Sequence, residues 1–205
     1  LDAQIKRLFL RLKVLGELEN TFIIFSSDNG ATKENHHDYQ FFKSSGNLKG
    51  GKRDLYEGGI RVLMIAYWKN KIVAGKTTNH QATFYDVMPT FAEIAKAKPS
   101  NKTDGISFLP ELLGRGNQPK HDFLYFEIQA GKGVKRFKQA TRFGKWKAIR
   151  LKDSYHTQLY DLSKDISEKN DISKEYPQIV KKANEILQKE SIKNNHFPYS
   201  GGVFK

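Results

Sequence analysis

An unbroken apolar run that ends in a polar turn constrains the fold of this chain more than any other feature. Residues 21–25 read Thr-Phe-Ile-Ile-Phe, and Ser-Ser-Asp-Asn-Gly follows directly at 26–30. Unbroken apolarity of this length is typical of a strand buried on both faces, as in a parallel sheet covered by helices. Residues 2–18 carry apolar side chains at helical spacing, which predicts a helix just before this strand. The helix–strand order favours an α/β architecture.

Later segments predict a change from alternating strands and helices to a run of short strands. Residues 62–67, Val-Leu-Met-Ile-Ala-Tyr, predict a second buried strand, and residues 83–97 predict a helix with one apolar face. From residue 121, short strand candidates follow one another between glycine or polar turns, which is typical of an antiparallel meander. The candidates lie at 123–128, 137–142, 146–150 and 158–160.

A helix over residues 171–191, with apolar residues on one face, is expected to close the chain. The sequence therefore predicts an α/β fold. It comprises part of a mixed, mostly parallel sheet flanked by helices, followed by a small C-terminal antiparallel sheet packed with one helix. The expected domains are residues 1–120, the α/β part, and residues 121–205, the antiparallel part.

Composition excludes several classes of protein. Hydrophobic residues make up 38% of the 205, so the chain is expected to fold rather than stay disordered. No apolar run approaches the roughly 20 residues of a membrane-spanning helix. Cysteine is absent, which excludes disulfides, thiolate metal sites and cysteine nucleophiles but fits periplasm and cytosol alike.

The charge balance points to an anionic partner. Lysine and arginine number 35 against 22 acidic residues, a formal net charge of +13. The basic residues are mostly interleaved with acids, with tight clusters only at 49–53 and 132–138, and no RNA-binding aromatic motif accompanies them. We therefore expect a basic face for an anionic substrate or polyanion, and no nucleic-acid partner.

Asp28 and Asn29 are candidate ligands of a hard cation. They follow the first predicted strand, and in open α/β sheets ligands bind outside the carboxyl ends of strands. A carboxylate and an amide carbonyl suit Ca²⁺ or Mg²⁺ better than a soft metal. Because Asp-Asn-Gly is also a common turn signal, a plain turn remains the alternative.

The glycine-rich stretch 31–59 is too long for an idle connection, and long loops often carry function. Within it, Gly50-Gly51-Lys52-Arg53 places a compact ammonium where flanking glycines let an oxyanion approach closely. It is not a Walker loop, and a solvated basic turn is the alternative. Glu57 and Arg61 flank two more glycines, and we expect them to form a structural pair that sets the loop.

At these residues the sequence resembles the type I, formylglycine-dependent sulfatases of the alkaline phosphatase superfamily. The resemblance is carried by Ser-Asp-Asn-Gly at 27–30 and Lys-Gly-Gly-Lys-Arg-Asp-Leu-Tyr-Glu-Gly-Gly-Ile-Arg-Val at 49–62. It spans roughly residues 2–190, through further motifs at 84–90, 104–109, 143–147 and 159–162. The stretch 33–42 looks like the bacterial branch that desulfates glycans.

The resemblance implies the C-terminal portion of a sulfatase that acts on a sulfated saccharide or an aryl sulfate. Asp28 and Asn29 would bind one Ca²⁺, and Lys52 would be catalytic by contacting the sulfate oxygens. His37 and Arg53 would be substrate contacts. A periplasmic or secreted location in a bacterium is also implied.

Other parts of the family site have no match in these 205 residues. The formylglycine nucleophile motif, the first pair of metal aspartates, and the upstream catalytic lysine and histidine are all without a counterpart. The resemblance thus implies that the nucleophile lies in an N-terminal half outside this chain, and that the chain alone is inactive.

Two alternatives remain at this point. One is a phosphodiesterase or phosphonate hydrolase of the same superfamily. Such enzymes usually carry Asp-His at the Asp28-Asn29 position for zinc, and an amide oxygen is a poor zinc ligand. The other is a non-catalytic module that binds polyanions through its basic surface.

Overall fold

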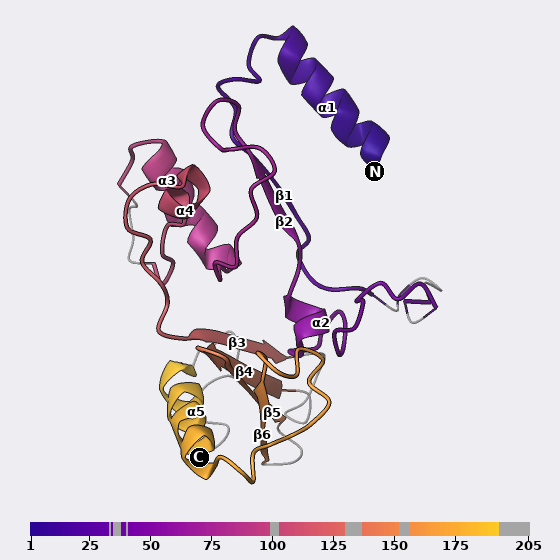
Figure 1. Ribbon diagram of the computed structural model, residues 1–205, viewed down its shortest axis with the longest axis vertical. Coiled ribbons are helices and arrows are strands. Elements are labelled where there is room, and N and C mark those ends of the chain that lie inside the picture. The colour runs from indigo at the N-terminus through magenta and orange to yellow at the C-terminus, as the bar shows by residue number, and fades with distance from the viewer. Residues whose placement is uncertain are drawn as a thin grey trace. The chain divides into compact units, whose positions relative to one another are not determined.

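The computed structural model describes residues 1–32, 34, 38–39, 41–98, 103–129, 137–151 and 156–192 (Figure 1). The chain forms two compact units, each of two segments. The first unit comprises residues 1–26 and 63–121, and the second comprises residues 27–62 and those from 122 onward. The stretch 27–62, which holds the candidate site residues, thus belongs to the same unit as the C-terminal sheet. The division into domains at residue 120 stays a prediction.

The first unit holds a strand pair and several helices. Its elements are α1 (Asp2–Val14), β1 (Ile23–Ser26), β2 (Met64–Tyr67), the 3₁₀ turn η1 (Phe84–Asp86), α3 (Val87–Ile94) and α4 (Leu109–Leu113). β1 and β2 pair antiparallel, with Ile23 opposite Tyr67. The ring of Phe9 on α1 packs edge-on against Tyr67 at 5.1 Å between centroids, so α1 contacts this strand pair. The expected N-terminal helix and both strands are confirmed.

The burial expected of the second strand is not found. Leu63, Met64 and Ile65 are 57%, 42% and 60% exposed. The pairing of β1 with β2 is antiparallel, and parallel neighbours are not among the strands that the structure describes. Apolar side chains favour burial, but only neighbouring elements can bury them.

Asp86 ties the helical part of the first unit together. Its carboxylate accepts hydrogen bonds from the backbone N–H groups of Thr83 (2.7 Å) and Ile106 (2.8 Å), and contacts the His121 ring at 2.8 Å. Asp86 is 1% exposed, and Thr83 and Asp86 form a capping box at the start of η1. His121 and Asp86 therefore have structural roles.

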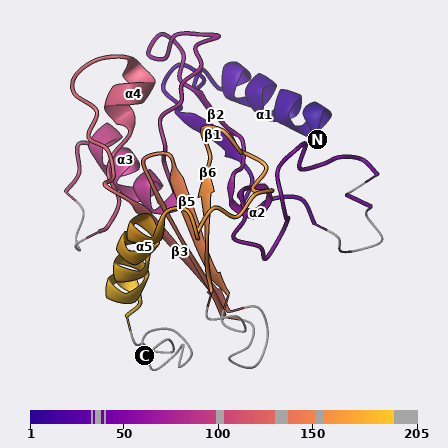
Figure 2. The same ribbon diagram turned by 60° about the horizontal axis from the view of Figure 1, so that its bottom comes forward.

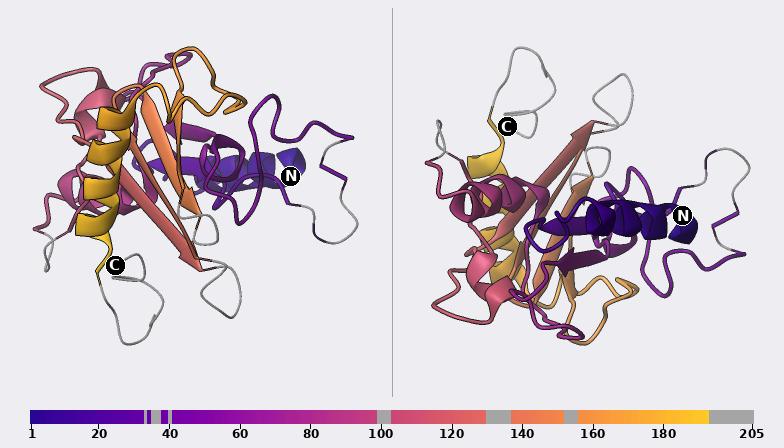
Figure 3. Two further views of the ribbon diagram at one scale, coloured as in Figure 1. Left: turned by 90° about the horizontal axis from the view of Figure 1, so that it is seen from below. Right: turned by 90° about the horizontal axis from the view of Figure 1, so that it is seen from above.

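The second unit is built on an antiparallel meander. Its elements are α2 (Glu57–Ile60), β3 (Leu124–Gln129), β4 (Phe137–Phe143), β5 (Trp146–Leu151), β6 (Thr157–Asp161) and α5 (Pro177–Glu190). The strands lie in the order β3-β4-β5-β6, and α5 lies along the sheet (Figures 2 and 3). A mixed α/β fold with a C-terminal antiparallel sheet and one packed helix is confirmed.

The two faces of this sheet are covered by different parts of the chain. Successive side chains of a strand point to opposite faces, so each strand contributes to both. On one face Ala148 and Leu159 pack with Ala183 of α5. On the other face, Ile149 and Tyr160 pack with Leu55 and Tyr56, which precede α2, and with Ile60 of α2. The sheet therefore packs directly against residues that follow Lys52 closely in the chain.

Candidate functional site

Asp28 and Asn29 lie on a turn that follows β1 in the chain. The Ser27 hydroxyl donates to the Asn29 carbonyl at 2.8 Å, and the Asn29 side-chain amide donates to the Gly30 carbonyl at 3.2 Å. The second bond directs the amide nitrogen at the backbone and leaves the side-chain carbonyl oxygen for another partner. Asp28 is exposed. The turn thus offers two oxygen ligands of the type that Ca²⁺ prefers.

Two ligands alone do not make a closed calcium site, since Ca²⁺ takes six to eight oxygens. Within the described ranges, no group of three histidine, cysteine, aspartate or glutamate side chains could hold a metal ion. The donor chemistry of Asp28 and Asn29 fits the predicted cation, and the remaining ligands would have to come from other groups.

Backbone hydrogen bonds join this turn to the loop between residue 31 and α2, which carries Lys52 and is called the lysine loop below. The N–H of Gly30 donates to the Gly59 carbonyl at 2.9 Å, and the N–H of Lys52 donates to the Ala31 carbonyl at 2.7 Å. A Cβ added at Gly30 would lie 1.7 Å from the carbonyl oxygen of Gly58. Only glycine permits this approach. The structure therefore brings Asp28 and Asn29, the predicted metal ligands, close in the chain fold to Lys52, the predicted sulfate contact. We call residues 28–32, 34 and 50–53 the loop cluster.

Glu34 holds both basic residues of the loop. Its carboxylate lies 2.9 Å from the Lys52 ammonium and 2.5 Å from the Arg53 guanidinium. The hydrogen bond from Lys52 and the charge of Arg53 lower the pKa of Glu34. Lys52 is about one-third exposed and Arg53 is more exposed. An anionic ligand could thus compete with Glu34 for these cations, a role of Glu34 that the sequence did not reveal.

A sharp turn shapes the backbone beside Lys52. Arg53 has a positive φ of 72°, a conformation that costs a non-glycine residue free energy. The Asp54 carboxylate accepts the N–H of Gly51 at 3.2 Å. Lys138 of β4 donates to the Arg53 carbonyl at 3.1 Å and to the Asp54 carboxylate at 2.8 Å. These contacts hold the turn from outside.

A buried ionic cluster lies next to this loop. Lys147 of β5 contacts the Glu57 carboxylate at 2.8 Å and that of Glu168 at 3.7 Å, and all three are at most 1% exposed. The Glu57 N–H donates to Glu168 at 2.7 Å. Arg61 lies 3.3 Å from Glu57, which confirms the expected structural pair, and Arg142 lies 3.7 Å from it.

The two buried carboxylates have opposite pKa shifts. Burial acts to raise the pKa of Glu57, but the charges of Lys147, Arg142 and Arg61 outweigh it and lower that pKa. Burial raises the pKa of Glu168 to about 7, because the attraction of Lys147 offsets only part of the desolvation. Glu168 is therefore the group of this cluster that titrates near neutral pH.

Histidines add no catalytic group to the described site. His37, the predicted substrate contact, lies outside the described residues. His156 contacts Asp171 at 2.7 Å and Ser173 at 3.4 Å through the same ring nitrogen, Nε2. A catalytic triad uses the two ring nitrogens for two different partners, so this constellation is not one.

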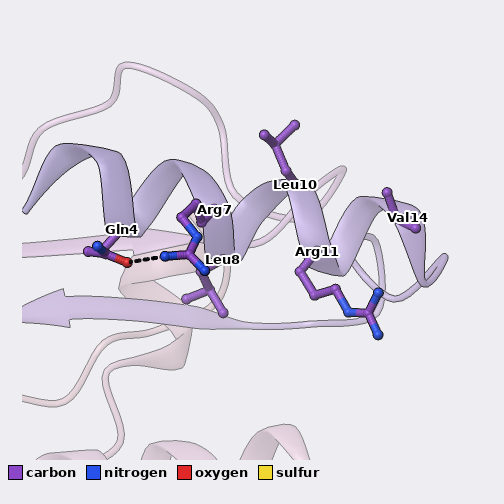
Figure 4. A pocket seen from close by; sticks show the side chains of 6 residues that line it. All are labelled: Gln4, Arg7, Leu8, Leu10, Arg11 and Val14. Atoms are coloured by element: carbon purple, nitrogen blue, oxygen red, sulfur yellow. Dashed lines mark hydrogen bonds between the residues drawn. The ribbon is translucent and has the colours of Figure 1, made fainter.

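A shallow hollow runs along α1 in the first unit (Figure 4). Side chains of α1 alone line it, and Arg7 donates to Gln4 at 3.2 Å within it. It contains none of the candidate residues.

No helix in the described part of the chain is both long and apolar enough to span a membrane.

Two family models match the sequence. The model described as Sulfatase matches residues 1–97, and that described as N-sulphoglucosamine sulphohydrolase, C-terminal, matches residues 50–193. The chain belongs to the sulfatase family. It is 36% identical over 149 residues to arylsulfatase A of Homo sapiens, covering 72% of this chain and 28% of that protein. It is 30% identical over 210 residues to N-acetylgalactosamine-6-O-sulfatase of Bacteroides thetaiotaomicron, covering 94% of this chain and 40% of that protein.

Several solved structures share the fold of this chain. The chain is similar to Ps i-CgsB in complex with k-i-k-neocarrahexaose, with a TM-score of 0.77 and 30% identity over 92% of this chain and 40% of that one. It is also similar to BT4656 in complex with D-glucosamine-2-N,6-O-disulfate, with a TM-score of 0.73 and 26% identity over 92% and 37%. The phosphonate monoester hydrolase of Agrobacterium radiobacter, at 21% identity and a TM-score of 0.70 over 91% and 38%, shares the fold alone. The chain spans two-fifths or less of the curated relatives named above.

The comparisons with known proteins thus agree with the predicted family. They confirm the resemblance that the glycine and lysine motifs carried. They leave the individual roles of Asp28, Asn29, His37, Lys52 and Arg53 as predictions.

Proposed function

We propose that this chain is the C-terminal portion of a sulfatase that hydrolyses the sulfate ester of a sulfated saccharide or an aryl sulfate. The observation that supports this most directly is the loop cluster itself. The backbone of Lys52 bonds to Ala31, two residues after Asn29, so a cationic side chain and two oxygen ligands are held in one small region. Such a region suits a tetrahedral oxyanion.

Lys52 is the residue that we assign to the sulfate group. Hydrolysis of the ester breaks an S–O bond and leaves negative charge on the departing oxygen and on the sulfate oxygens. A compact ammonium placed in advance stabilises this charge more in the transition state than in the bound substrate. Glu34 holds the Lys52 ammonium at 2.9 Å before substrate arrives, and we infer that sulfate displaces it.

Asp28 and Asn29 would hold the calcium ion that the family resemblance implies. When bound, the ion would supply positive charge to the sulfate oxygens. The formylglycine nucleophile, which the resemblance also implies, would come from outside this chain. The residues of the loop cluster bind, orient and screen the sulfate group, but none of them supplies the nucleophile.

Arg53 and His37 are proposed to contact the organic part of the substrate. Arg53 is 61% exposed and shares Glu34 with Lys52, so a saccharide hydroxyl or a second sulfate could reach it. The substrate class is supported by the saccharide ligands named for the structures similar to this chain. A periplasmic or secreted location in a bacterium accords with such substrates, and cell fractionation tests it.

A phosphoester or phosphonate substrate is the rival, since a phosphonate monoester hydrolase shares the fold. Asn29 disfavours it, because an amide oxygen is a poor zinc ligand. The second rival is a polyanion-binding module without catalysis, which the net charge of +13 would suit. It predicts heparin binding that weakens with salt and no hydrolysis of any ester.

The decisive experiment compares substrates and one loop variant. The complete enzyme that contains this chain should hydrolyse an aryl sulfate or a sulfated saccharide faster than the matching phosphonate or phosphodiester. Lys52→Ala should lower kcat on the order of 10²–10³-fold, as loss of an oxyanion donor does. Lys52→Arg should recover little of this loss, because a planar fork does not replace a point charge.

Lys43→Ala is the matched control, because Lys43 is an exposed lysine of the same loop. Its kcat should stay within two-fold of wild type. A Lys52→Ala variant within a few-fold of wild type would show that Lys52 is a solvated basic residue. Preference for the phosphorus esters would show that the proposed reaction is wrong.

A further inference from the structure

One face of the C-terminal sheet presents polar side chains to the lysine loop. Residues paired across antiparallel strands share a face, and so do residues two apart on one strand. The register pairs Arg142 with Lys147 and Lys147 with Tyr160. The polar residues of this face are Lys138, Arg142, Lys147, Gln158 and Tyr160. A sheet face with two lysines and an arginine is unusual unless their charges meet partners.

Three of the four strands, β4, β5 and β6, each hold a different point of the loop. Lys138 of β4 binds the Arg53 carbonyl and the Asp54 carboxylate. Lys147 of β5 binds the Glu57 carboxylate at 2.8 Å. On β6, Gln158 accepts the Tyr56 hydroxyl at 2.7 Å. The loop is therefore fixed at residues on the C-terminal side of Lys52, from Arg53 to Glu57.

Glu168 closes the set of contacts from beyond β6. It accepts the N–H of Glu57 at 2.7 Å, and its backbone carbonyl accepts the Lys49 ammonium at 3.1 Å. That ammonium also lies 4.2 Å from the centre of the Tyr56 ring. The loop is thus held before Lys52 as well as after it.

The loop has little regular structure of its own to define its shape. Between residue 31 and the start of α2 at Glu57 it contains no strand or helix among the residues that the structure describes. Gly51 lies against the Ala31 carbonyl, and Gly58 and Gly59 lie against carbonyls of residues 49–54, so that backbone rather than side chains makes these contacts. Apart from its bonds to Ala31 and Glu34, the position of Lys52 must then depend on the contacts that hold the loop from outside.

We propose that the Lys138–Lys147 face of the sheet is the platform that positions Lys52 for sulfate, with Glu57, Lys147 and Glu168 as positioning residues of the reaction. This inference rests on the proposed function, because it assigns these residues to the same site. It gives the buried ionic cluster a purpose other than stability. Buried ion pairs contribute little net stability compared with apolar packing, so a purpose of this kind is a testable reason for their presence.

The first experiment measures the loop in this chain without any assay of activity. Amide hydrogen exchange followed by NMR compares wild type with Lys138→Met and Lys147→Met. The reporters are the N–H groups of Lys52 and Gly58, which bond to Ala31 and Lys49. They should exchange at least ten-fold faster in both variants, while in Lys138→Met the β4–β5 ladder should change less than three-fold.

Leu187→Ala is the matched control. Leu187 lies on α5 and is 0% exposed, and its carbonyl accepts the side-chain amide of Gln139, which points to the sheet face opposite Lys138. Loss of its side chain should destabilise the unit through a cavity. It should therefore speed exchange in the ladder and in the loop alike. A Lys138→Met variant that speeds exchange in the ladder and in the loop alike, as Leu187→Ala does, would overturn the proposal.

The second experiment uses the complete enzyme at a temperature where each variant is fully folded. Lys138→Met should lower kcat about ten-fold with less than a three-fold change in KM, because a misplaced Lys52 stabilises the transition state less. Lys138→Arg, which keeps a cation there, should recover most of the loss. Lys138 is partly exposed, so this variant remains informative even if Lys147→Met does not fold.

The outcomes separate the two proposals. If the loop loosens in Lys138→Met but kcat stays at the wild-type value, the platform holds a loop without positioning the reaction, and the inference is wrong. If the wild-type enzyme hydrolyses no sulfate ester, the proposed function fails first, and the exchange data alone decide whether the sheet holds the loop.

Discussion

Replacement of Glu168 by glutamine should remove most of the pH dependence of stability between pH 5 and pH 8. Glu168 is 0% exposed, and burial raises its pKa from 4.5 to about 7. The charged groups that face it include Lys147, Glu57, Lys49 and Arg142. Since the attraction of the two lysines does not offset the desolvation, the folded state prefers this carboxyl protonated.

The direction and the size follow from linkage. A carboxyl whose pKa is higher in the folded state contributes stability that is complete below pH 4.5 and is lost as the pH rises to about 7. A difference of one between the pKa of the folded state and that of the unfolded state corresponds to about 1.4 kcal/mol. The wild-type chain should thus lose on the order of 2–3 kcal/mol of unfolding free energy between pH 5 and pH 8 from this group.

Glutamine retains the shape and the neutral state of the protonated carboxyl, so Glu168→Gln should lose less than about 1 kcal/mol over the same interval. Urea unfolding at four pH values measures both chains. The difference between them removes the contributions of groups that both retain. Glu175→Gln, an exposed carboxyl on the same segment, should follow wild type. Equal slopes for wild type and Glu168→Gln would refute the assignment of the raised pKa to this residue.

Three further predictions concern the loop cluster. Gly30→Ala should prevent folding of the second unit or destabilise it by more than about 3 kcal/mol in chemical unfolding, because its Cβ would overlap a carbonyl oxygen. Gly75→Ala, outside the loop cluster, is the control: nothing lies within 4 Å of the added Cβ, so the variant should cost only about 1 kcal/mol, from the positive φ of Gly75. Glu34→Gln should strengthen binding of inorganic sulfate to the loop by about three-fold or more in calorimetry, because it frees Lys52 and Arg53; unchanged affinity would show that these cations do not meet the anion. The chain alone should bind Ca²⁺ at millimolar affinity or weaker, and micromolar binding abolished by Asp28→Ala would reveal a more complete site.

The parts of the fold with strong local patterns were predictable. The apolar spacing of residues 2–18 and 171–191 indicated the helices at each end, and alternation with glycine turns indicated the meander. These signals are local, because each strand or helix pattern lies within one short stretch. The exposure of Met64 and Ile65 on β2 was not predictable, because burial depends on which elements cover a strand.

The site was predictable only where its chemistry is local. Asp28 stood out because it directly follows a predicted strand, and Lys52 because two glycines precede it. Glu34 gave no signal, since its partners lie 18 and 19 positions further along the chain. Glu168 gave none either, because its bond to Glu57 spans 111 positions.

Lys147 did leave a usable signal. In strand 146–151 the side chains of Lys147, Ile149 and Leu151 share one face by strict alternation. A lysine in line with apolar residues on a strand contradicts the usual pattern of apolar-in and polar-out. The physical resolution of such a conflict is a buried counter-ion, here Glu57 at 2.8 Å.

The membership of residues 27–62 in the second unit has a thermodynamic explanation. Residues 63–121 separate the two segments of this unit, and closing a flexible loop of that length would cost about 3–4 kcal/mol. That cost grows only with the logarithm of loop length, so a long intervening segment is tolerated. Burial of Leu55, which is 5% exposed and packs on Ile149 and Tyr160, contributes about 1.5–3 kcal/mol against it. The contacts of Lys138 and Tyr56 with the loop and sheet add to this, so the loop associates with the sheet despite its distance in sequence.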